Sequence, residues 1–282
     1  MKQTLKQFIP QPIWQLSRDT YDAFRRIPEL PGAYLHPWRR ASIRRLAGLK
    51  DIHKGKRAFI IGNGPSLKQT DLSKLKNEIT FGMNRIYLAF PEWGFTTNYL
   101  CITNDLVVEQ FVDDINALTI PKFIAWRSRH HFKNLHRFDS AQRQPSSFIL
   151  PVFIYTSYTG PKFSSDVRGR VWEGATVTNL ALQLAFHMGI EKAILIGVDH
   201  NFTRFAKGDA NKTVVSQGDD PNHFAPNYFG KGVKWQLPDL DTSEIGYAFA
   251  REAYRQAGRE VIDATVGGKL TIFPKVDYDS LF

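Results

Sequence analysis

The sequence has few of the features that mark secreted or membrane-spanning proteins. Its one cysteine, Cys101, cannot form a disulfide within the chain, and its apolar surroundings predict a buried, unreactive thiol. No apolar run approaches the roughly 18 residues of a transmembrane helix, and no signal-peptide pattern is present. These absences predict a cytoplasmic protein.

Two common nucleotide-binding signatures are missing as well. No Walker A motif occurs, and the turn at 62–66 lacks the third glycine of a dinucleotide fingerprint because Leu67 stands in its place. The two glycines of this turn still permit positive φ and a close approach of a ligand to the backbone. Asn63 between them both donates and accepts hydrogen bonds, which suits a nucleobase or a sugar. A purely structural strand–turn–helix is the alternative.

Charge is spread unevenly along the chain. Residues 1–57 carry 13 Lys and Arg against four Asp and Glu, whereas the net charge of the whole chain is +10. Bulky apolar residues are mixed with these arginines, and prolines cut the segment into short helical pieces. We therefore expect a basic extension, 1–55, that binds an anionic membrane surface, a partner or its own domain. Nucleic acid is not an expected partner, because the rest of the chain lacks a basic stripe.

Beyond residue 56, short apolar runs alternate with helical patterns, which predicts an α/β fold: a single Rossmann-like domain, 56–282, with a mostly parallel sheet. The predicted strands are 57–61, 79–83, 99–103, 122–125, 148–150, 193–197 and 260–263. Helices are expected at 176–188 and at 242–257, the second with Asp241 as N-cap and Glu244 closing a capping box. The segment of about 201–240 lacks periodicity and is expected to form a lid.

Three asparagines, Asn63, Asn84 and Asn104, each follow a predicted strand. Because the carboxyl ends of parallel strands share one edge of a sheet, these amides should converge there. Amides bind neutral, hydrogen-bonding ligands such as nucleosides. A fourth strand end adds Asp199 and His200 to the same edge.

Histidines supply the candidate for proton transfer. His223 lies in the polar lid beside the acidic pair 219–220, and imidazole titrates near neutrality. His223 is therefore the expected general base, with His200 as the next candidate. His130, His131 and His136 lack carboxylates or thiols at ligand spacing, so we expect no metal site and interpret all three as surface residues.

The order of several short motifs resembles that of a known family. These motifs are 62–67 (GNGPSL), 83–87 (MNRIY), 103–104 (TN), 197–199 (GVD) and 220–224 (DPNHF). They resemble bacterial CMP-sialic-acid-dependent sialyltransferases. They equally resemble a wider related family that includes motility-associated flagellin glycosyltransferase domains and archaeal hydroxymethylpterin pyrophosphokinases. The resemblance covers about residues 56–282.

This resemblance implies a nucleotide-sugar-binding catalytic domain that works without metal or cofactor and uses a CMP-sugar as donor substrate. The residues implied to hold the nucleotide and its sugar are Gly62, Asn63, Gly64, Ser66, Asn84, Asn104, Gly174, Ala175, Thr176, Asp199 and His200. His223 would deprotonate the acceptor hydroxyl, and Arg170 would approach the phosphate. The sialyltransferases have a tyrosine where this chain has Asn201, so Tyr228 or Lys231 would support the departing phosphate instead.

The leading interpretation is a glycosyltransferase that moves an acidic sugar from a CMP-activated donor to a surface glycan or glycolipid acceptor. It would work in the cytoplasm or on the inner face of the cytoplasmic membrane. A pyrophosphokinase that acts on a hydroxymethylpterin with ATP and magnesium is the second interpretation, and a non-catalytic nucleotide-binding protein is the third. The sequence leaves open the donor sugar, the acceptor, the linkage and whether the chain forms a homo-oligomer.

Overall fold

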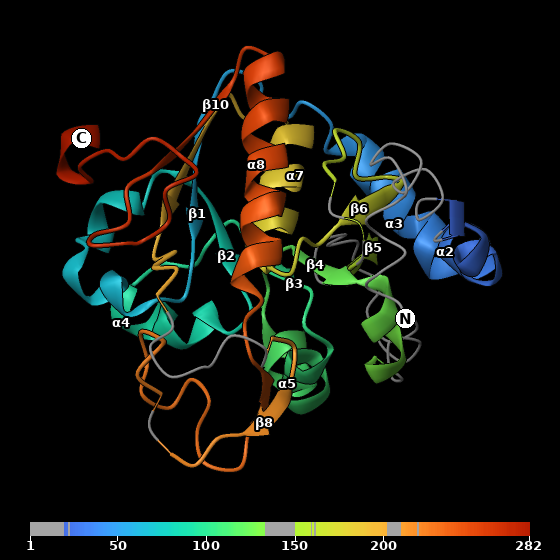
Figure 1. Ribbon diagram of the computed structural model, residues 1–282, viewed down its shortest axis with the longest axis horizontal. Coiled ribbons are helices and arrows are strands. Elements are labelled where there is room, and N and C mark those ends of the chain that lie inside the picture. Colours follow the sequence, from blue (N-terminus) through green and yellow to red (C-terminus); the bar gives the residue numbers. More distant parts are fainter. Residues whose placement is uncertain are drawn as a thin grey trace, which may run out of the picture.

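A sheet of eight strands forms the centre of the protein (Figure 1). The computed structural model describes residues 20–21, 23–132, 150–158, 160, 162–201, 210–218 and 220–282. In spatial order the strands are β10 (Glu260–Asp263), β7 (Lys192–Ile196), β1 (Arg57–Ile61), β2 (Ile79–Met83), β3 (Tyr99–Ile102), β4 (Lys122–Ala125), β5 (Val152–Ser157) and β6 (Arg170–Trp172). Every neighbouring pair is parallel. The predicted α/β fold with a mostly parallel sheet is confirmed.

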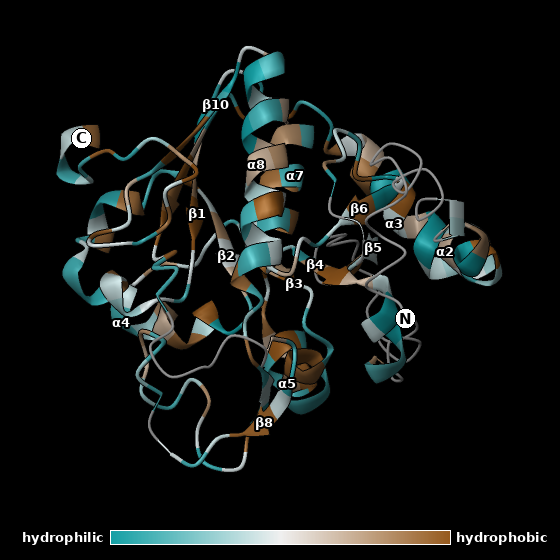
Figure 2. Ribbon diagram, in the orientation of Figure 1, coloured by the Kyte–Doolittle hydropathy of each residue, from teal (hydrophilic) through white to brown (hydrophobic). Residues whose placement is uncertain are grey.

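Helices cover both faces of the sheet because its strands are apolar on both sides. The α-helices with described bounds are α2 (Leu30–Leu35), α3 (Pro37–Gly48), α4 (Phe90–Trp93), α5 (Asp105–Ala117), α7 (Val177–His187) and α8 (Leu240–Gln256). In β1, Ala58 and Ile60 pack into the core layer that α7 and α8 cover. Phe59 and Ile61 point into the opposite layer, beneath α4 and α5. Figure 2 shows β1 in brown between these helices, as expected of a strand buried on both faces.

The chain reverses its direction of winding at β1. From β1 the strand order runs outward through β2 to β6, and the chain then returns to place β7 on the other side of β1. In open α/β sheets, ligands bind outside the carboxyl ends of the strands at such a switch point. The fold therefore places the ends of β1 and β7 where a ligand site is expected.

Four predicted strands, at 57–61, 79–83, 122–125 and 260–263, have the observed bounds. The strand predicted at 148–150 is wrong within the described residues: Leu150 lies in a bend, and β5 begins at Val152 after Pro151. The sequence analysis also missed β6, β8 (Thr213–Val215) and β9 (Lys234–Gln236), of which β8 and β9 pair with each other. Each of these strands has three residues, and β8 and β9 are exposed at their ends, so no apolar run marks them.

The N-cap of α8 is Asp239, and the prediction of Asp241 is wrong. Asp239 Oδ1 accepts a hydrogen bond from Thr242 N at 3.0 Å, and Asp241 lies in the first turn. Either acid could supply a cap from the sequence alone, since both precede the apolar face of the helix. Glu244 does not close a capping box but contacts His200 Nε2 at 2.9 Å. Helix α7 agrees closely with its prediction and has Thr176 as N-cap.

Helix α3 joins part of the predicted N-terminal extension to the sheet. Ser42 Oγ accepts a hydrogen bond from Phe153 N in β5 at 2.9 Å, and Arg39 Nη2 donates to Arg168 O at 2.7 Å. Residues 1–19 of the extension lie outside the described part of the chain, and the domain boundary near residue 55 stays a prediction. Among the described residues, no helix has the length and apolarity that crossing a membrane requires.

A buried lysine in β4 makes stability depend on pH. Lys122 is 0 % exposed, donates from Nζ to Leu118 O at 2.6 Å, and burial lowers its pKa to about 8. Between that value and the unfolded pKa of about 10.4 the unfolded chain binds more protons, so stability rises with pH. Relative to Lys122→Met, the wild type should therefore gain about 2 kcal/mol between pH 8 and about 9.5.

Urea unfolding at several pH values tests this expectation. The comparison with Lys122→Met cancels the titration of other groups, and Lys50→Met, which changes an exposed lysine, is the matched control. A stability difference between the wild type and Lys122→Met that stays constant over this pH window would contradict it.

Candidate functional site

A cavity of about 1030 Å³ opens at the carboxyl ends of the strands. Its lining includes residues that follow β1, β2, β3, β4 and β7, together with part of the predicted lid. Ten of the predicted site residues line it: Gly62, Asn63, Gly64, Asn84, Asn104, Ala175, Thr176, Asp199, His200 and His223. The edge of the sheet therefore brings most of the predicted residues together.

Two of the asparagines present amide oxygens that need a donor. Asn63 Nδ2 donates to Met83 O at 3.1 Å, but Asn63 Oδ1 is buried and has no hydrogen-bond partner among the described residues. Asn84 Oδ1 is also buried without a hydrogen-bond partner among the described residues. The backbone of Asn84 is in the left-handed region, with φ at 48°. A buried acceptor without a partner costs about 1–3 kcal/mol. A ligand that donates hydrogen bonds to both oxygens would remove this cost.

Asn104 has a different role from the other two. It is the N-cap of α5, and its Oδ1 accepts a hydrogen bond from Leu106 N at 2.9 Å. The helix therefore uses the amide oxygen, which leaves the amide N–H groups of Asn104 for a ligand.

The turn after β1 is tied directly to the end of β7. Ser66 donates to Asp199 from its backbone N at 3.1 Å and from its Oγ at 2.7 Å. Burial raises the pKa of Asp199, and the Ser66 donors act against that rise. Asp199 thus frames the cavity mainly by holding this turn, while Ser66 lies behind it and does not line the cavity.

The glycines of the turn are needed for space. A Cβ at Gly62 would lie 2.1 Å from Gly197 O, and one at Gly64 would lie 1.7 Å from Asp199 Oδ2. Neither glycine has a positive φ, so a left-handed backbone conformation is not the reason that glycine is needed at these two positions. The close approach of the β1 and β7 ends leaves no room for a side chain.

The N-terminus of α7 faces the cavity. Gly174 and Ala175, at φ 51° and 55°, turn the chain so that Thr176 caps the helix and, with Thr178, lines the cavity. Free backbone N–H groups and the helix dipole make this end favourable for an anion such as a phosphate. Gly174 itself lies outside the lining. A Cβ added at Gly174 would lie 2.2 Å from Asn179 Nδ2.

His223 is held in a defined orientation inside the lid. Its Nδ1 lies 2.7 Å from Asp220 Oδ2, and its ring stacks on Tyr228 with centroids 4.1 Å apart and planes 2° apart. The next residue, Phe224, donates from N to Asn63 O at 2.9 Å, which fixes the lid to the turn after β1. With Nδ1 donating to Asp220, Nε2 is the nitrogen that can accept a proton. Residue 219 lies outside the described residues.

Three predicted site residues, Tyr228, Lys231 and Arg170, lie outside the cavity lining. Tyr228 is fully buried beneath His223, and its hydroxyl accepts from Arg85 N at 3.3 Å, so it cannot support a departing phosphate. Lys231 is exposed outside the cavity lining. Arg170 also lies outside the lining and stacks on Trp172, with its guanidinium 4.5 Å from the ring centroid. His200 lines the cavity, and its Nε2 contacts Glu244 Oε1 at 2.9 Å.

The sequence analysis missed Arg127 and Glu173. Arg127 follows β4 and lines the cavity, and its Nη2 donates to Glu173 Oε2 at 2.9 Å. Nη1 also donates to Thr156 Oγ1 at 3.1 Å, and Nη2 to the carbonyl oxygen of Thr103. Arg127 thus lines the cavity, where Arg170 was expected. Its position directly after a correctly predicted strand is the signal that identifies it.

His130 is exposed, as expected of a surface residue, whereas His131 is half-buried and lies beside a carboxylate that the sequence spacing did not reveal. His136 lies outside the described residues. Asp105 Oδ1 lies 3.3 Å from His131 Nε2, and the side chain of His131 is 16 % exposed. Sequence spacing could not reveal this contact, because Asp105 follows β3 and the histidines follow β4.

The close contact between the two strand ends makes Gly62 sensitive to substitution. Gly62→Ala should lower the free energy of unfolding by about 1–3 kcal/mol, since the added Cβ meets backbone atoms of Gly197 that cannot move freely. Gly48→Ala is the matched control, because nothing lies within 4 Å of its Cβ position. Urea unfolding of both variants measures the difference, and equal stabilities would show that the turn can shift.

Comparisons with known proteins give one family match and a distant structural neighbour. Residues 39–205 match the model of the family described as "6-hydroxymethylpterin diphosphokinase MptE-like". No curated protein matches the chain. Among solved structures, the MAf glycosyltransferase from Magnetospirillum magneticum AMB-1 is similar, with a TM-score of 0.47 and 14 % identity over 94 % of this chain and 42 % of that chain. The chain thus spans less than half of that glycosyltransferase, and so distant a likeness says nothing about activity.

Proposed function

This chain belongs to the 6-hydroxymethylpterin diphosphokinase MptE-like family, and we propose that it is a transferase that moves a group from a nucleotide-activated donor to an acceptor hydroxyl. Membership confirms the wider related family that the motifs predicted. The finer proposal is glycosyl transfer of an acidic, sialic-acid-like sugar from a CMP-activated donor to a glycan or glycolipid.

The observation that carries this proposal is the pairing of His223 with Asp220. The carboxylate orients the imidazole and stabilises the imidazolium that forms when Nε2 takes a proton. In the proposed step, His223 Nε2 takes the proton of the acceptor hydroxyl, and the acceptor oxygen bonds to the anomeric carbon of the donor sugar. The bond between that carbon and the phosphate oxygen breaks, and CMP leaves with the electron pair.

The donor would lie along the edge of the sheet. The unpartnered oxygens of Asn63 and Asn84 suit the amino group of a cytosine or the hydroxyls of a sugar. The N-terminus of α7 and the guanidinium of Arg127 would stabilise the charge of the departing phosphate. These contributions need no metal at the reacting atoms.

A diphosphokinase that uses ATP and Mg²⁺ is the second candidate, because the family description names that activity. Mg²⁺ prefers oxygen ligands, mainly carboxylates and water. Two carboxylates in the cavity lining already bind protein donors, since Asp199 accepts from Ser66 and Glu173 accepts from Arg127. Asp220 lies outside the lining and holds His223. These residues fit Mg²⁺ poorly, so we favour glycosyl transfer.

Thermal shift with nucleotides separates the two candidates. CMP without metal should raise the melting temperature, because a ligand that binds the folded state alone stabilises it. Asn63→Ala should weaken CMP binding by about 1–3 kcal/mol in calorimetry. Tight binding of ATP that requires Mg²⁺, with no response to CMP, would favour the diphosphokinase.

Loss of the base should reduce turnover without loss of donor binding. General-base catalysis typically contributes about 10²–10⁴-fold, so His223→Ala should slow transfer by that factor while CMP affinity stays near that of the wild type. Asp220→Asn should also slow transfer, because the carboxylate that orients the His223 imidazole is removed. His53→Ala removes a histidine from outside the cavity lining and is the control. Normal turnover in His223→Ala would place the base elsewhere. A wild type that binds the nucleotide but transfers no sugar in any assay would favour a non-catalytic binding protein.

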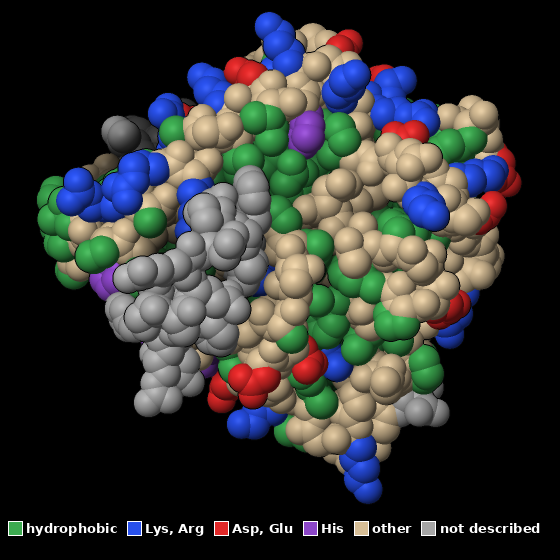
Figure 3. Space-filling view, turned by 180° about the vertical axis from the view of Figure 1, so that it is seen from behind, with side chains coloured by type: hydrophobic (Ala, Val, Ile, Leu, Met, Phe, Trp, Pro, Cys, Tyr) green, Lys and Arg blue, Asp and Glu red, His purple; other side chains and the backbone are tan. Residues whose placement is uncertain are grey.

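We also propose that the N-terminal helices dock on an anionic membrane and bring a glycolipid acceptor to the cavity. Tyr21, Phe24 and Leu35 are each about two-thirds exposed, at 69 %, 67 % and 70 %. Figure 3 shows Lys and Arg beside hydrophobic side chains on its left, where α2 and α3 lie. Arg26 and Glu29 of the same segment line the cavity. Docking would thus place the cavity at the membrane surface.

Vesicle flotation tests the docking surface. Replacing Tyr21, Phe24 and Leu35 by serine should abolish flotation with vesicles that contain anionic lipid, whereas α3 and its packing on β5 stay intact. Salt should weaken the binding of the wild type. Equal flotation of the wild type and the triple variant would show that another surface binds the membrane, or none.

A further inference from the structure

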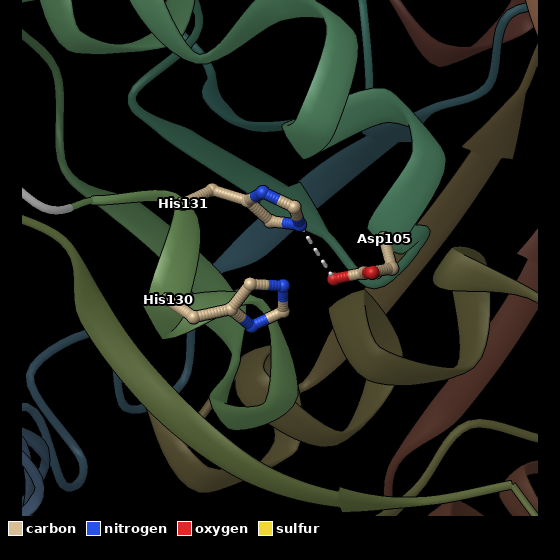
Figure 4. A group of neighbouring side chains, drawn as sticks. All are labelled: Asp105, His130 and His131. Carbon is tan, nitrogen blue, oxygen red and sulfur yellow. Dashed lines mark ion pairs between the residues drawn. The ribbon is translucent and has the colours of Figure 1, made fainter.

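Three side chains that the proposed reaction does not use meet at the edge of the cavity. Asp105 is the first residue of α5, after β3, and His130 and His131 lie on the 3-10 helix η6 (Trp126–His131), after β4. Because β3 and β4 are parallel neighbours, their carboxyl ends lie together. Figure 4 shows the two imidazole rings and the carboxylate pointing toward a common centre.

The distances suit a single ion. One ligand atom of each residue lies within 4.8 Å of the other two, and His131 Nε2 and Asp105 Oδ1 are 3.3 Å apart. Two ligands at about 2.0–2.2 Å from a tetrahedral ion are separated by roughly 3.3–3.6 Å. The pair is therefore already at bonding separation for one ion, and a small rotation of the exposed His130 ring would bring in the third ligand.

The hydrogen bonds around the group prepare it for a cation. His130 Nδ1 lies 2.7 Å from Arg127 O, so it donates there and leaves Nε2 with its lone pair. Metal-binding histidines commonly have such a bond on their other nitrogen. Asp105 Oδ1 and His131 Nε2 are both buried, and apart from their contact with each other they have no hydrogen-bond partner among the described residues.

We propose that Asp105, His130 and His131 bind a divalent transition-metal ion of the Zn²⁺ class. Two imidazoles and one carboxylate are a ligand set for such ions and a poor one for Mg²⁺. Three protein ligands leave a coordination position open, and Asp105 lines the cavity, so water or an anionic oxygen of a bound ligand would fill it.

Nearby charges do not prevent this. Arg127 forms a hydrogen-bonded ion pair with Glu173, which offsets part of its repulsion of a cation. Arg129 stacks on Trp126, with its guanidinium 4.3 Å from the ring centroid. The ion would lie beside β3 and β4, whereas His223 is tied to the end of β1, so it would bind a part of the ligand remote from the hydroxyl that His223 deprotonates. The site rests on its own residues and not on the proposed transfer reaction.

Calorimetric titration of the untagged full chain with ZnCl₂, and visible absorption with CoCl₂, test the site. We expect one equivalent of Zn²⁺ per chain and a cobalt spectrum of low coordination number. His131→Ala and Asp105→Asn should each weaken binding by more than the roughly 10–100-fold that loss of an outer hydrogen-bond partner costs.

His53→Ala is the matched control, since it removes an imidazole outside the group and should leave Zn²⁺ affinity unchanged. Its Nε2 bonds to Tyr99 OH at 2.7 Å. His130→Ala changes an exposed side chain, so it keeps the test informative if His131→Ala fails to fold. A wild type that takes up no Zn²⁺, or variants of all three residues that bind it as tightly as the wild type, would overturn the proposal.

Discussion

The hydrogen bonds between Ser66 and Asp199 hold together the two strand ends on which the cavity is built. They cross the switch point between β1 and β7, where Gly62 N also donates to Ile196 O at 2.7 Å and Gly64 N to Gly197 O at 2.9 Å. The backbones approach so closely that no side chain fits at either glycine. Other open α/β folds separate the strand ends here to admit a ligand. In this chain the strand ends are closed against each other, and the cavity extends along the neighbouring ends of β2, β3 and β4.

The same turn positions the lid. The carbonyl oxygen of Asn63 accepts from Phe224 N at 2.9 Å, while no described residue donates to the amide oxygen of Asn63. One residue thus contacts both the lid that holds His223 and the space where a donor would bind. Because Tyr228 stacks beneath His223 and also bonds to the backbone of Arg85, the imidazole is supported from the second strand end too. The base and the amides therefore belong to one packed unit.

Sequence reasoning located this edge but not the contacts within it. The end of a strand can be predicted from where an apolar run stops. That reasoning found Asn63 and Asn84, and it could also have found Arg127, which was missed. Roles that depend on partners far away in sequence were not accessible. The burial of Tyr228, the stacking of Arg170 on Trp172 and the contact of Asp105 with His131 each join segments whose relative placement no local pattern encodes.

The distribution of satisfied and unsatisfied polar groups indicates what the cavity recognises. The carboxylates of Asp199, Asp220 and Glu173 all have protein partners, so they offer little to a cation. Among the described residues, the amide oxygens of Asn63 and Asn84 have no hydrogen-bond partner, so a donor group there would remove the cost of burying them. Negative charge is favoured at the N-terminus of α7 instead. The cavity therefore combines buried hydrogen-bond acceptors along the strand ends with a helix end that favours an anion.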